Sequence, residues 1–149
     1  MRVVLACSSG GHLVQLYQLK PWWSDHERLW VTFRTPDAMS LLKGEAVEYA
    51  YHPTTRNIPN LLRNLGFAWR LMRRYRPDVI VSDGAGVSFP FFLVARVLGI
   101  ATVYLEVFDR IDVPTLSGWL CYPLSDLFLL QWPEQRSAYP RGLVIGKLL

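Results

Sequence analysis

Short apolar runs alternate with longer amphipathic stretches along the whole chain, and this alternation restricts the fold more than any other feature. The runs rich in Val, Ile, Leu and aromatic residues predict strands at Arg2–Cys7, Arg28–Phe33, Ala46–Tyr51, Asp78–Ser82, Thr102–Glu106, Asp126–Gln131 and Leu143–Ile145. The stretches between them predict helices at His12–Lys20, Pro36–Lys43, Ile58–Arg74, Val87–Leu98 and Thr115–Tyr122. Strands and helices that alternate in this way predict an α/β fold, a Rossmann-like parallel sheet flanked by helices, as a single domain over residues 1–149.

The composition limits the class of protein. Hydrophobic residues make up 51% of the 149 residues and aromatic residues 13%, which excludes a disordered chain. No apolar run reaches the roughly 18–20 residues that span a bilayer, and no signal-peptide pattern follows Met1, so we expect a cytoplasmic protein. Cys7 and Cys121 are expected to be free buried thiols, and we expect neither a metal site nor a cofactor.

A turn of small residues follows the first predicted strand. Ser8, Ser9, Gly10, Gly11 and His12 stand where a parallel sheet collects its ligands, at the carboxyl end of a strand and the start of a helix. Glycines there let the backbone approach a phosphate, and the helix start offers free N–H groups. The turn carries neither the G-x-G-x-x-G fingerprint nor the Gly-Lys-Ser/Thr of a P-loop. We expect His12 to face the cleft, either as a functional group or as a helix cap.

Two carboxylates follow later strands. Asp83 and Gly84 begin a second small-residue turn, where Asp83 either serves the site or caps the next helix. Glu106 ends an apolar strand, which favours a polar cleft around it, although the nearby Arg110 offers a structural partner. Because the first and fifth strands end at the same edge of such a sheet, we expect His12 and Glu106 to share one crevice.

The segment between Glu48 and Asp78 contains no carboxylate and a block of arginines, which indicates an anionic partner or a solvated helix face. On a helical wheel one face carries Leu61, Leu65, Ala68, Met72 and Tyr75, and the opposite stripe carries Arg56, Arg63, Arg70 and Arg74. Such a stripe suits anionic lipid while the apolar face packs on the sheet. Nucleic acid is disfavoured, because no nucleic-acid motif accompanies the arginines.

Several motifs together resemble a known family. In chain order they are Ser8-Ser9-Gly10-Gly11-His12, Arg76-Pro77-Asp78-Val79-Ile80-Val81-Ser82-Asp83-Gly84, the helix that ends Leu98-Gly99-Ile100, and Tyr104-Leu105-Glu106. They resemble the N-terminal half of GT-B glycosyltransferases that act on polyprenyl-diphosphate lipids, including the enzyme that makes lipid II. They resemble still more the Alg-type acceptor subunit of the split UDP-N-acetylglucosamine transferase, and its bacterial exopolysaccharide and capsule counterparts.

The resemblance implies a membrane-associated subunit that binds a polyprenyl-diphosphate-linked sugar and needs a separate donor-binding GT-B half for the UDP-sugar. In such a subunit we expect catalysis from His12 and Glu106, and binding of the acceptor and its phosphates by Ser9, Gly10, Gly11, Asp83 and Gly84. Unlike the eukaryotic subunit, the sequence shows no N-terminal transmembrane helix, so we expect peripheral attachment to the inner face of the membrane. The sequence ends at Leu149, where a second domain would begin, so we expect the donor-nucleotide domain on another chain. Phe89, Phe91 and Phe92 are the expected membrane wedge.

Three hypotheses remain at this point. The chain is half of an enzyme site in which His12 is the general base, since imidazole titrates near neutral pH. Alternatively it is a non-catalytic membrane adapter that recruits and activates the donor-binding partner. A stand-alone nucleotide-binding protein is disfavoured by the missing fingerprints.

Overall fold

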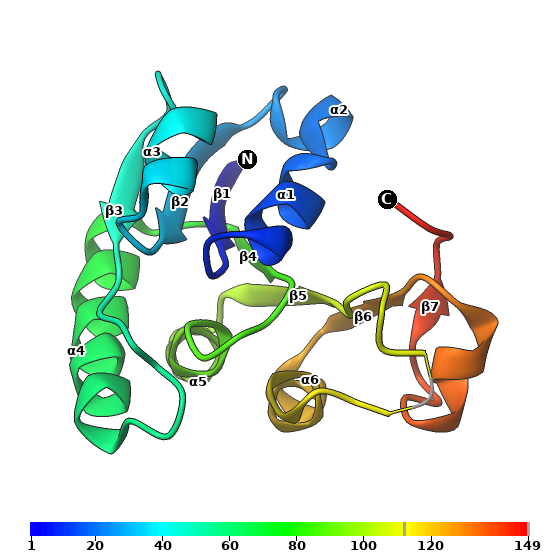
Figure 1. The fold of residues 1–149 in the computed structure, drawn as a ribbon. Coiled ribbons are helices and arrows are strands. Elements are labelled where there is room, and N and C mark those ends of the chain that lie inside the picture. Colours follow the sequence, from blue (N-terminus) through cyan, green and yellow to red (C-terminus); the bar gives the residue numbers. More distant parts are fainter. Residues whose placement is uncertain (112, 149) are drawn as a thin grey trace.

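The computed structural model describes residues 1–111 and 113–148. Within these residues the backbone forms one seven-stranded sheet, in which all neighbouring strands run parallel in the order β3-β2-β1-β4-β5-β6-β7 (Figure 1). The strands are β1 Arg2–Ala6, β2 Glu27–Thr32, β3 Val47–Tyr49, β4 Val79–Ser82, β5 Ala101–Leu105, β6 Leu127–Leu130 and β7 Leu143–Val144. The predicted Rossmann-like parallel sheet is confirmed.

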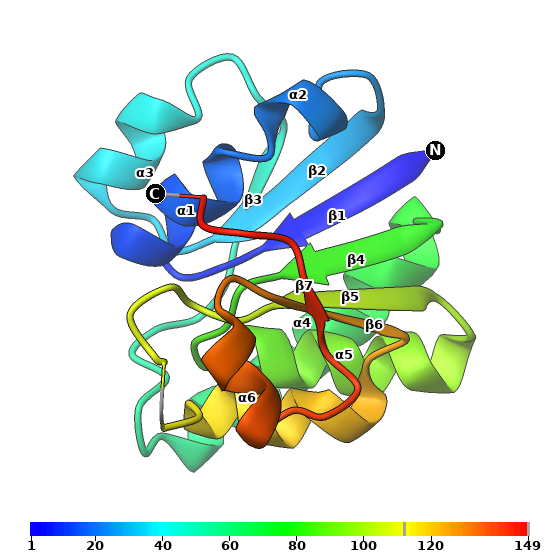
Figure 2. The same cartoon turned by 90° about the vertical axis from the view of Figure 1, so that its right-hand side faces the viewer.

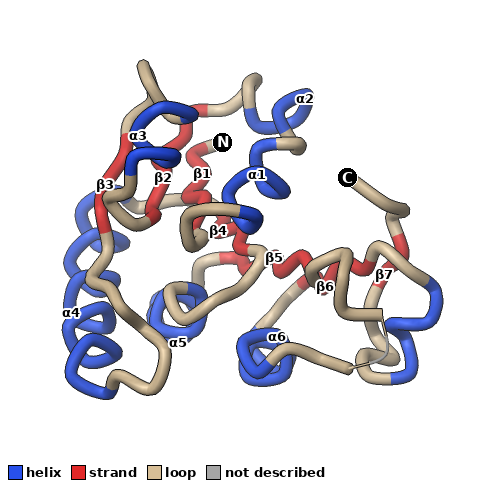
Figure 3. The backbone as a smooth tube through the Cα atoms, viewed as in Figure 1, coloured by secondary structure: helices blue, strands red, loops and turns tan. Residues whose placement is uncertain are grey.

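Helices cover both faces of the sheet. They are α1 Gly11–Tyr17, α2 Lys20–Trp23, α3 Pro36–Leu41, α4 Ile58–Tyr75, α5 Ser88–Leu98 and α6 Leu116–Cys121, with short 3-10 turns at Tyr122–Leu124 and Pro133–Ser137. Helices α1, α2 and α3 lie on one face and α4, α5 and α6 on the other, as the ribbon and the tube show (Figures 2 and 3). The polypeptide is therefore a three-layer α/β/α domain.

The first helix is shorter than predicted. The sequence pattern predicts a helix to Lys20, but α1 ends at Tyr17 and a separate turn, α2, begins at Lys20. Pro21 explains the break, because proline has no N–H and its ring clashes with the carbonyl of the residue four positions earlier, which is Tyr17.

Each face of the sheet has its own apolar core. On the α1 face, Leu13 and Leu16 pack with Trp23 and Trp30, and the two indole rings meet edge to face with centroids 5.5 Å apart. On the α5 face, Phe92 packs edge to face on Tyr104, which stacks in turn on a phenylalanine of β6. Residues of the central strands β1 and β4 contribute to both cores, so these strands are packed on both faces.

Helix α5 is buried on most sides, which corrects the expected membrane wedge. Phe91 and Phe92 are fully buried in the α5 core, and Phe89 is half-buried. The helix packs against the sheet and against α4 and α6, so its apolar residues serve three contacts at once. The prediction that Phe91 and Phe92 insert into a membrane is therefore wrong.

Helix α4 shows the predicted division into two faces. Ala68 and Met72 are buried, whereas Arg63, Arg70 and Arg74 are exposed. Arg74 forms an ion pair with Glu48, with nitrogen and oxygen 2.6 Å apart. Among the described residues, no helix combines the length and apolar character that crossing a bilayer requires.

The burial of α5 predicts a stability effect. Phe92→Ala should lower the free energy of unfolding by about 3–5 kcal/mol, the usual cost of emptying a buried aromatic position. Urea denaturation followed by circular dichroism measures this loss. Leu62→Ala, at a position 62% exposed on α4, is the control and should change the value little. Equal small losses in both variants would contradict the packing described for α5.

Candidate functional site

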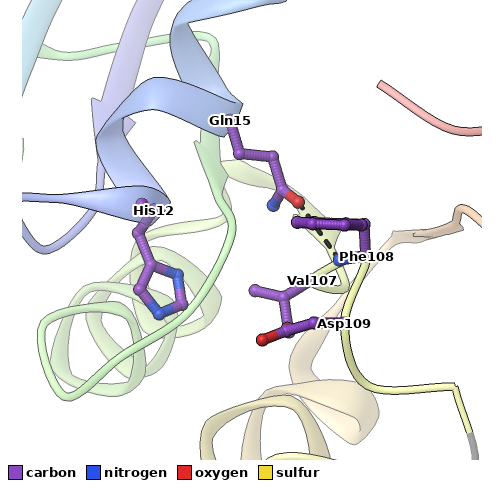
Figure 4. A pocket seen from close by; sticks show the side chains of 6 residues that line it. His12, Gln15, Val107, Phe108 and Asp109 are labelled. Atoms are coloured by element: carbon purple, nitrogen blue, oxygen red, sulfur yellow. Dashed lines mark hydrogen bonds between the residues drawn. The ribbon is translucent and has the colours of Figure 1, made fainter. Parts of the chain in front are cut away.

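The candidate site lies where the strand order reverses, at the carboxyl ends of β1 and β4. The turn after β1 and the turn after β4 meet there, and the loop after β5 forms the opposite wall. Between them is an open pocket of about 200 Å³ (Figure 4), lined by Gly11, His12, Gln15, Val107, Phe108 and Asp109. The ends of the first, fourth and fifth strands thus converge as the sequence predicts.

His12 stands in the first turn of α1 with 30% of its side chain exposed. Its Nδ1 lies 3.1 Å from the backbone oxygen of Asp83 and 3.6 Å from the carboxylate Oδ1. Because a carbonyl oxygen only accepts, the neutral ring donates from Nδ1 and keeps its lone pair on Nε2. This is the tautomer that a general base needs if Nε2 is to take a proton.

Asp83 is fully buried directly behind His12. The Gln15 amide nitrogen lies 3.1 Å from its Oδ2, and burial raises the pKa of the carboxyl to about 6. Burial by itself lowers the pKa of His12, but the hydrogen bonding and negative charge of Asp83 outweigh it, so the pKa is raised above its ordinary value. Both pKa values are therefore above their ordinary ones, which brings that of Asp83 close to the range in which acid–base catalysis works best.

Of the two roles expected for Asp83, the structure contradicts the helix cap. It does not cap α5, which begins at Ser88 with Val87 at the cap position. Because it is fully buried, it contacts His12 and Gln15 and does not line the pocket. The position supports an orienting role toward the imidazole in place of direct acceptor binding.

Glu106 does not reach His12. Its Oε2 accepts a hydrogen bond of 2.6 Å from the Tyr139 hydroxyl, and its Oε1 accepts one of 3.2 Å from the Thr115 hydroxyl. Side chains alternate along a strand, so Glu106 projects from the same face as Tyr104, in the α5 core, while α1 covers the other face.

The expectation that His12 and Glu106 share one crevice is therefore wrong. Among the described ion pairs none joins it to Arg110, so that structural alternative fails as well. Glu106 instead ties the end of β5 to the start of α6 and to the loop before β7, since Thr115 is the cap residue of α6.

The glycine turn after β1 is open to solvent. Gly10 has φ +79°, a conformation that favours glycine, and its N–H donates to Asp37 Oδ2 at 2.8 Å. A Cβ added at Gly10 or Gly11 would meet no atom within 4 Å, so space for a ligand lies over this backbone. Ser9 is half-buried in the same turn. Phosphate binding by these residues stays a prediction.

Gly84 has a packing role. Its φ is +114°, and a Cβ there would lie 2.6 Å from the Tyr104 hydroxyl and 3.5 Å from Cε1 of His12. The missing side chain lets the imidazole lie against the second turn. Gly84 is buried, so the structure gives it this role and not the expected direct contact with an acceptor.

Sequence reasoning missed the amide and loop residues of the site. Gln15 is buried among the apolar residues of α1, and Phe108 and Asp109 form the far wall of the pocket. A polar residue between the apolar positions of the predicted helix was the available signal for Gln15. Asp37, which holds the Gly10 N–H, carries no comparable signal, because it is an exposed residue in the first turn of α3.

Comparison with known proteins now gives the family. The sequence profile of a family described as oligosaccharide biosynthesis protein Alg14 like matches residues 2–148. The chain belongs to this family.

Two curated relatives agree with the Alg14-like assignment. A UDP-N-acetylglucosamine transferase subunit ALG14 from Rattus norvegicus is 32% identical over 94 residues, which cover 59% of this chain and 44% of the rat protein. A UDP-N-acetylglucosamine–N-acetylmuramyl-(pentapeptide) pyrophosphoryl-undecaprenol N-acetylglucosamine transferase from Moorella thermoacetica is 37% identical over 89 residues, covering 58% of this chain and 23% of that enzyme. The matches thus span less than half the length of either relative.

A solved structure shows the same fold. The crystal structure of MurG from Acinetobacter baumannii superposes with a TM-score of 0.74 at 18% identity, covering 89% of this chain and 41% of MurG. The Alg14-like chain therefore has the Rossmann-like fold of a GT-B glycosyltransferase domain, and the resemblance drawn from the sequence motifs is confirmed.

The geometry of the pair predicts a change in the titration of the histidine. In Asp83→Asn the charge is removed at constant size, and the pKa of His12 should fall, because burial lowers it and only the backbone oxygen of residue 83 and the weaker charge of Asp109 still raise it. Proton NMR titration of the imidazole measures it, with His26 and His52 as internal references. Glu106→Gln is the control and should leave the His12 titration in place. An unchanged His12 titration in Asp83→Asn would contradict the pairing.

Proposed function

We propose that this Alg14-like chain is the acceptor-binding subunit of a two-component inverting glycosyltransferase. It acts on a polyprenyl-diphosphate-linked sugar, and a separate donor-binding GT-B half brings the UDP-sugar. The observation that carries the proposal is the His12–Asp83 pair at the pocket where β1 and β4 end. The family match supports a role in oligosaccharide biosynthesis, and the relative described as a transferase subunit supports the need for a partner.

The reaction is a direct displacement at the anomeric carbon of the donor sugar. The acceptor hydroxyl attacks that carbon, the bond to the nucleoside diphosphate breaks, and the diphosphate leaves with the bonding pair. Nε2 of His12 takes the hydroxyl proton, and the buried Asp83 carboxylate stabilises the imidazolium that forms. A carboxylate that stabilises the protonated ring makes the imidazole a stronger base.

The acceptor is proposed to bind over the glycine turn, next to the base. The first intrahelical hydrogen bond of α1 is donated by the Val14 N–H to the Gly10 oxygen. The N–H groups of the preceding residues, Gly11 and His12 among them, therefore point out of the helix start, where a phosphate oxygen is a suitable acceptor. The space over Gly10 and Gly11 supports this placement, with Ser9 beside it.

The membrane contact is proposed for an apolar corner different from the predicted wedge. Ile58 and Leu62 at the start of α4 and Leu116 and Trp119 on α6 are 62–72% exposed, and we call these four residues the apolar corner. Two of them, Ile58 and Leu116, line a groove of about 240 Å³ together with the half-buried Phe89. Exposed apolar patches of this kind mark contact surfaces.

Arginines flank the apolar corner. Arg56 lines the same groove, and Arg63 is exposed one turn further along α4. Peripheral membrane binding combines two elements: apolar side chains that enter the lipid and cations that contact anionic headgroups. We therefore propose that the chain lies on the inner face of the cell membrane by this corner.

Mutation of the base tests the catalytic proposal. With the chain assembled with its donor-binding partner, His12→Ala should lower turnover on the order of 10²-fold or more, the scale of losing a general base. Transfer of radiolabelled sugar to a polyprenyl-diphosphate-linked acceptor measures it. His26→Ala is the matched control, because His26 directly precedes β2 and so lies at the amino ends of the parallel strands, opposite the site. Near-normal turnover of His12→Ala would refute the base and favour the adapter hypothesis.

Vesicle binding tests the apolar corner. Ile58→Ser with Leu116→Ser should weaken binding to phosphatidylglycerol-containing vesicles by at least about tenfold, since burying each side chain is worth about 1.5–3 kcal/mol. Sedimentation with vesicles measures it. The matched control, Val97→Ser with Leu143→Ser, removes two apolar side chains that are 73% and 50% exposed elsewhere. Equal binding of the two double variants would refute the apolar corner.

The dependence of vesicle binding on salt tests the contribution of the arginines. Arg63→Glu with Arg70→Glu should weaken binding to the same vesicles at low salt, and the difference should shrink at high salt because surface charges are screened. Binding as tight as that of the parent chain at low salt would mean that the stripe is only solvated.

A further inference from the structure

A buried amide connects the two walls of the pocket. Gln15 is 2% exposed and lies one turn after His12 on α1. Its Nε2 lies 3.1 Å from Asp83 Oδ2, and its Oε1 accepts hydrogen bonds from the Phe108 N–H at 3.2 Å and from Gln131 Nε2 at 2.7 Å. One side chain therefore contacts both the carboxylate behind His12 and the loop that faces it. Figure 4 shows the hydrogen bond to this loop.

Backbone groups fix the orientation of this amide. The Phe108 N–H only donates, so Oε1 of Gln15 must face it and the amide NH₂ must face Asp83. Gln131 is fixed in the same way, because its Nε2 also donates to the Glu106 backbone oxygen at 2.9 Å and its Oε1 accepts from the Leu148 N–H at 3.0 Å. The two amides therefore cannot flip without losing a backbone partner.

We infer that Gln15 is a positioning residue for the proposed base, because it holds the Asp83 carboxylate against His12 and anchors the 107–109 loop at the opposite wall. Its catalytic meaning rests on the proposed function, whereas its contacts do not. Gln15 itself is buried and acts through Asp83, so a direct role on substrate is not part of the inference.

The charged and titratable groups around the pair are few. His12 faces Asp83, and Asp109 from the loop adds a weaker negative charge. Burial raises the pKa of the Cys7 thiol and of the Tyr104 hydroxyl, and the charge of Asp83 adds to the rise at Cys7 and, more weakly, at Tyr104. The Gln15 amide is thus the neutral donor that stabilises the ionised form of Asp83 from the side away from His12.

Loss of the Gln15 donor should shift the pKa of Asp83 in one direction. A buried carboxylate that loses a hydrogen bond becomes more basic, so the pKa of Asp83 rises further above its ordinary value. The reactive state of the pair is ionised Asp83 with neutral His12. The pH at which that state forms therefore moves upward when Gln15 cannot donate.

The test is Gln15→Met, which keeps an unbranched side chain and removes the amide. Titration of the Asp83 ¹³Cγ resonance in the chain should move its midpoint upward by about one pH unit or more, the value of a hydrogen bond to a charged group. Gln131→Met is the matched control, because it removes a buried amide that belongs to the same network but does not contact Asp83. In this variant the titration midpoint of Asp83 should equal that of the parent chain. A parental midpoint in folded Gln15→Met, or the same shift in both variants, would overturn the inference.

A second readout uses the enzyme assembled with its partner. In Gln15→Met the acidic limb of the pH–rate profile should move upward in the same direction as the Asp83 midpoint, and in Gln131→Met it should not. His12→Ala tests the proposed function separately. If His12→Ala is active while the Asp83 midpoint still moves in Gln15→Met, the base is wrong and the positioning contact stands.

Gln15→Glu provides the second variant if the methionine does not fold. The new carboxyl keeps an acceptor for the Phe108 N–H and places a second acid beside Asp83. Two carboxyls at one buried place cannot both ionise easily, so one midpoint should rise strongly. Two ordinary carboxyl midpoints would show that Gln15 is not held against Asp83.

Discussion

A carboxylate buried at the end of a central strand must be hydrogen-bonded, and the arrangement of this site follows from that requirement. Two side chains from α1 approach Asp83: the amide of Gln15 donates to its Oδ2, and the imidazole of His12 donates to its backbone oxygen and lies 3.6 Å from Oδ1. The two lie on one face of α1 because they are three residues apart. The first helix is thereby fixed against β4, and its exposed N-terminal turn is fixed with it. The backbone oxygen of Asp83 fixes the tautomer of the histidine, and the nearby carboxylate raises its pKa.

The fold was predictable because its signals are distributed over many residues. The same fold is indicated by the continuous apolar strands, by the alternating helices and by the turn of small residues after β1. A local error such as the helix broken at Pro21 therefore did not affect the predicted fold. The convergence of the turns after β1 and β4 followed from the strand order that a doubly wound sheet adopts. His12 was found because it is a titratable residue in a turn of glycines and serines.

Other parts of the site depend on which way a single side chain points, and the sequence contains that information only weakly. Glu106 ends the expected strand, but the alternation of side chains places it with Tyr104 on the α5 face, opposite α1. Phe91 and Phe92 look like a surface cluster because α5 is apolar on nearly every side, and such a helix gives no periodicity to separate buried from exposed positions. Gln15 lacks a charge, and its place between apolar positions of the predicted helix is a weak signal, so its role becomes clear only from its buried partners.

The two outer strands are short, β3 with three residues and β7 with two, and this limits how another protein can associate with the sheet. A short edge offers few unpaired backbone groups, so a long added strand finds no template there. Recognition of a second protein then depends on side chains, which are specific to each sequence, and not on main-chain pairing, which accepts almost any extended segment. In a family with such short edge strands, binding specificity can change by a few substitutions at contacting positions, because side chains and not main-chain pairing distinguish one partner from another.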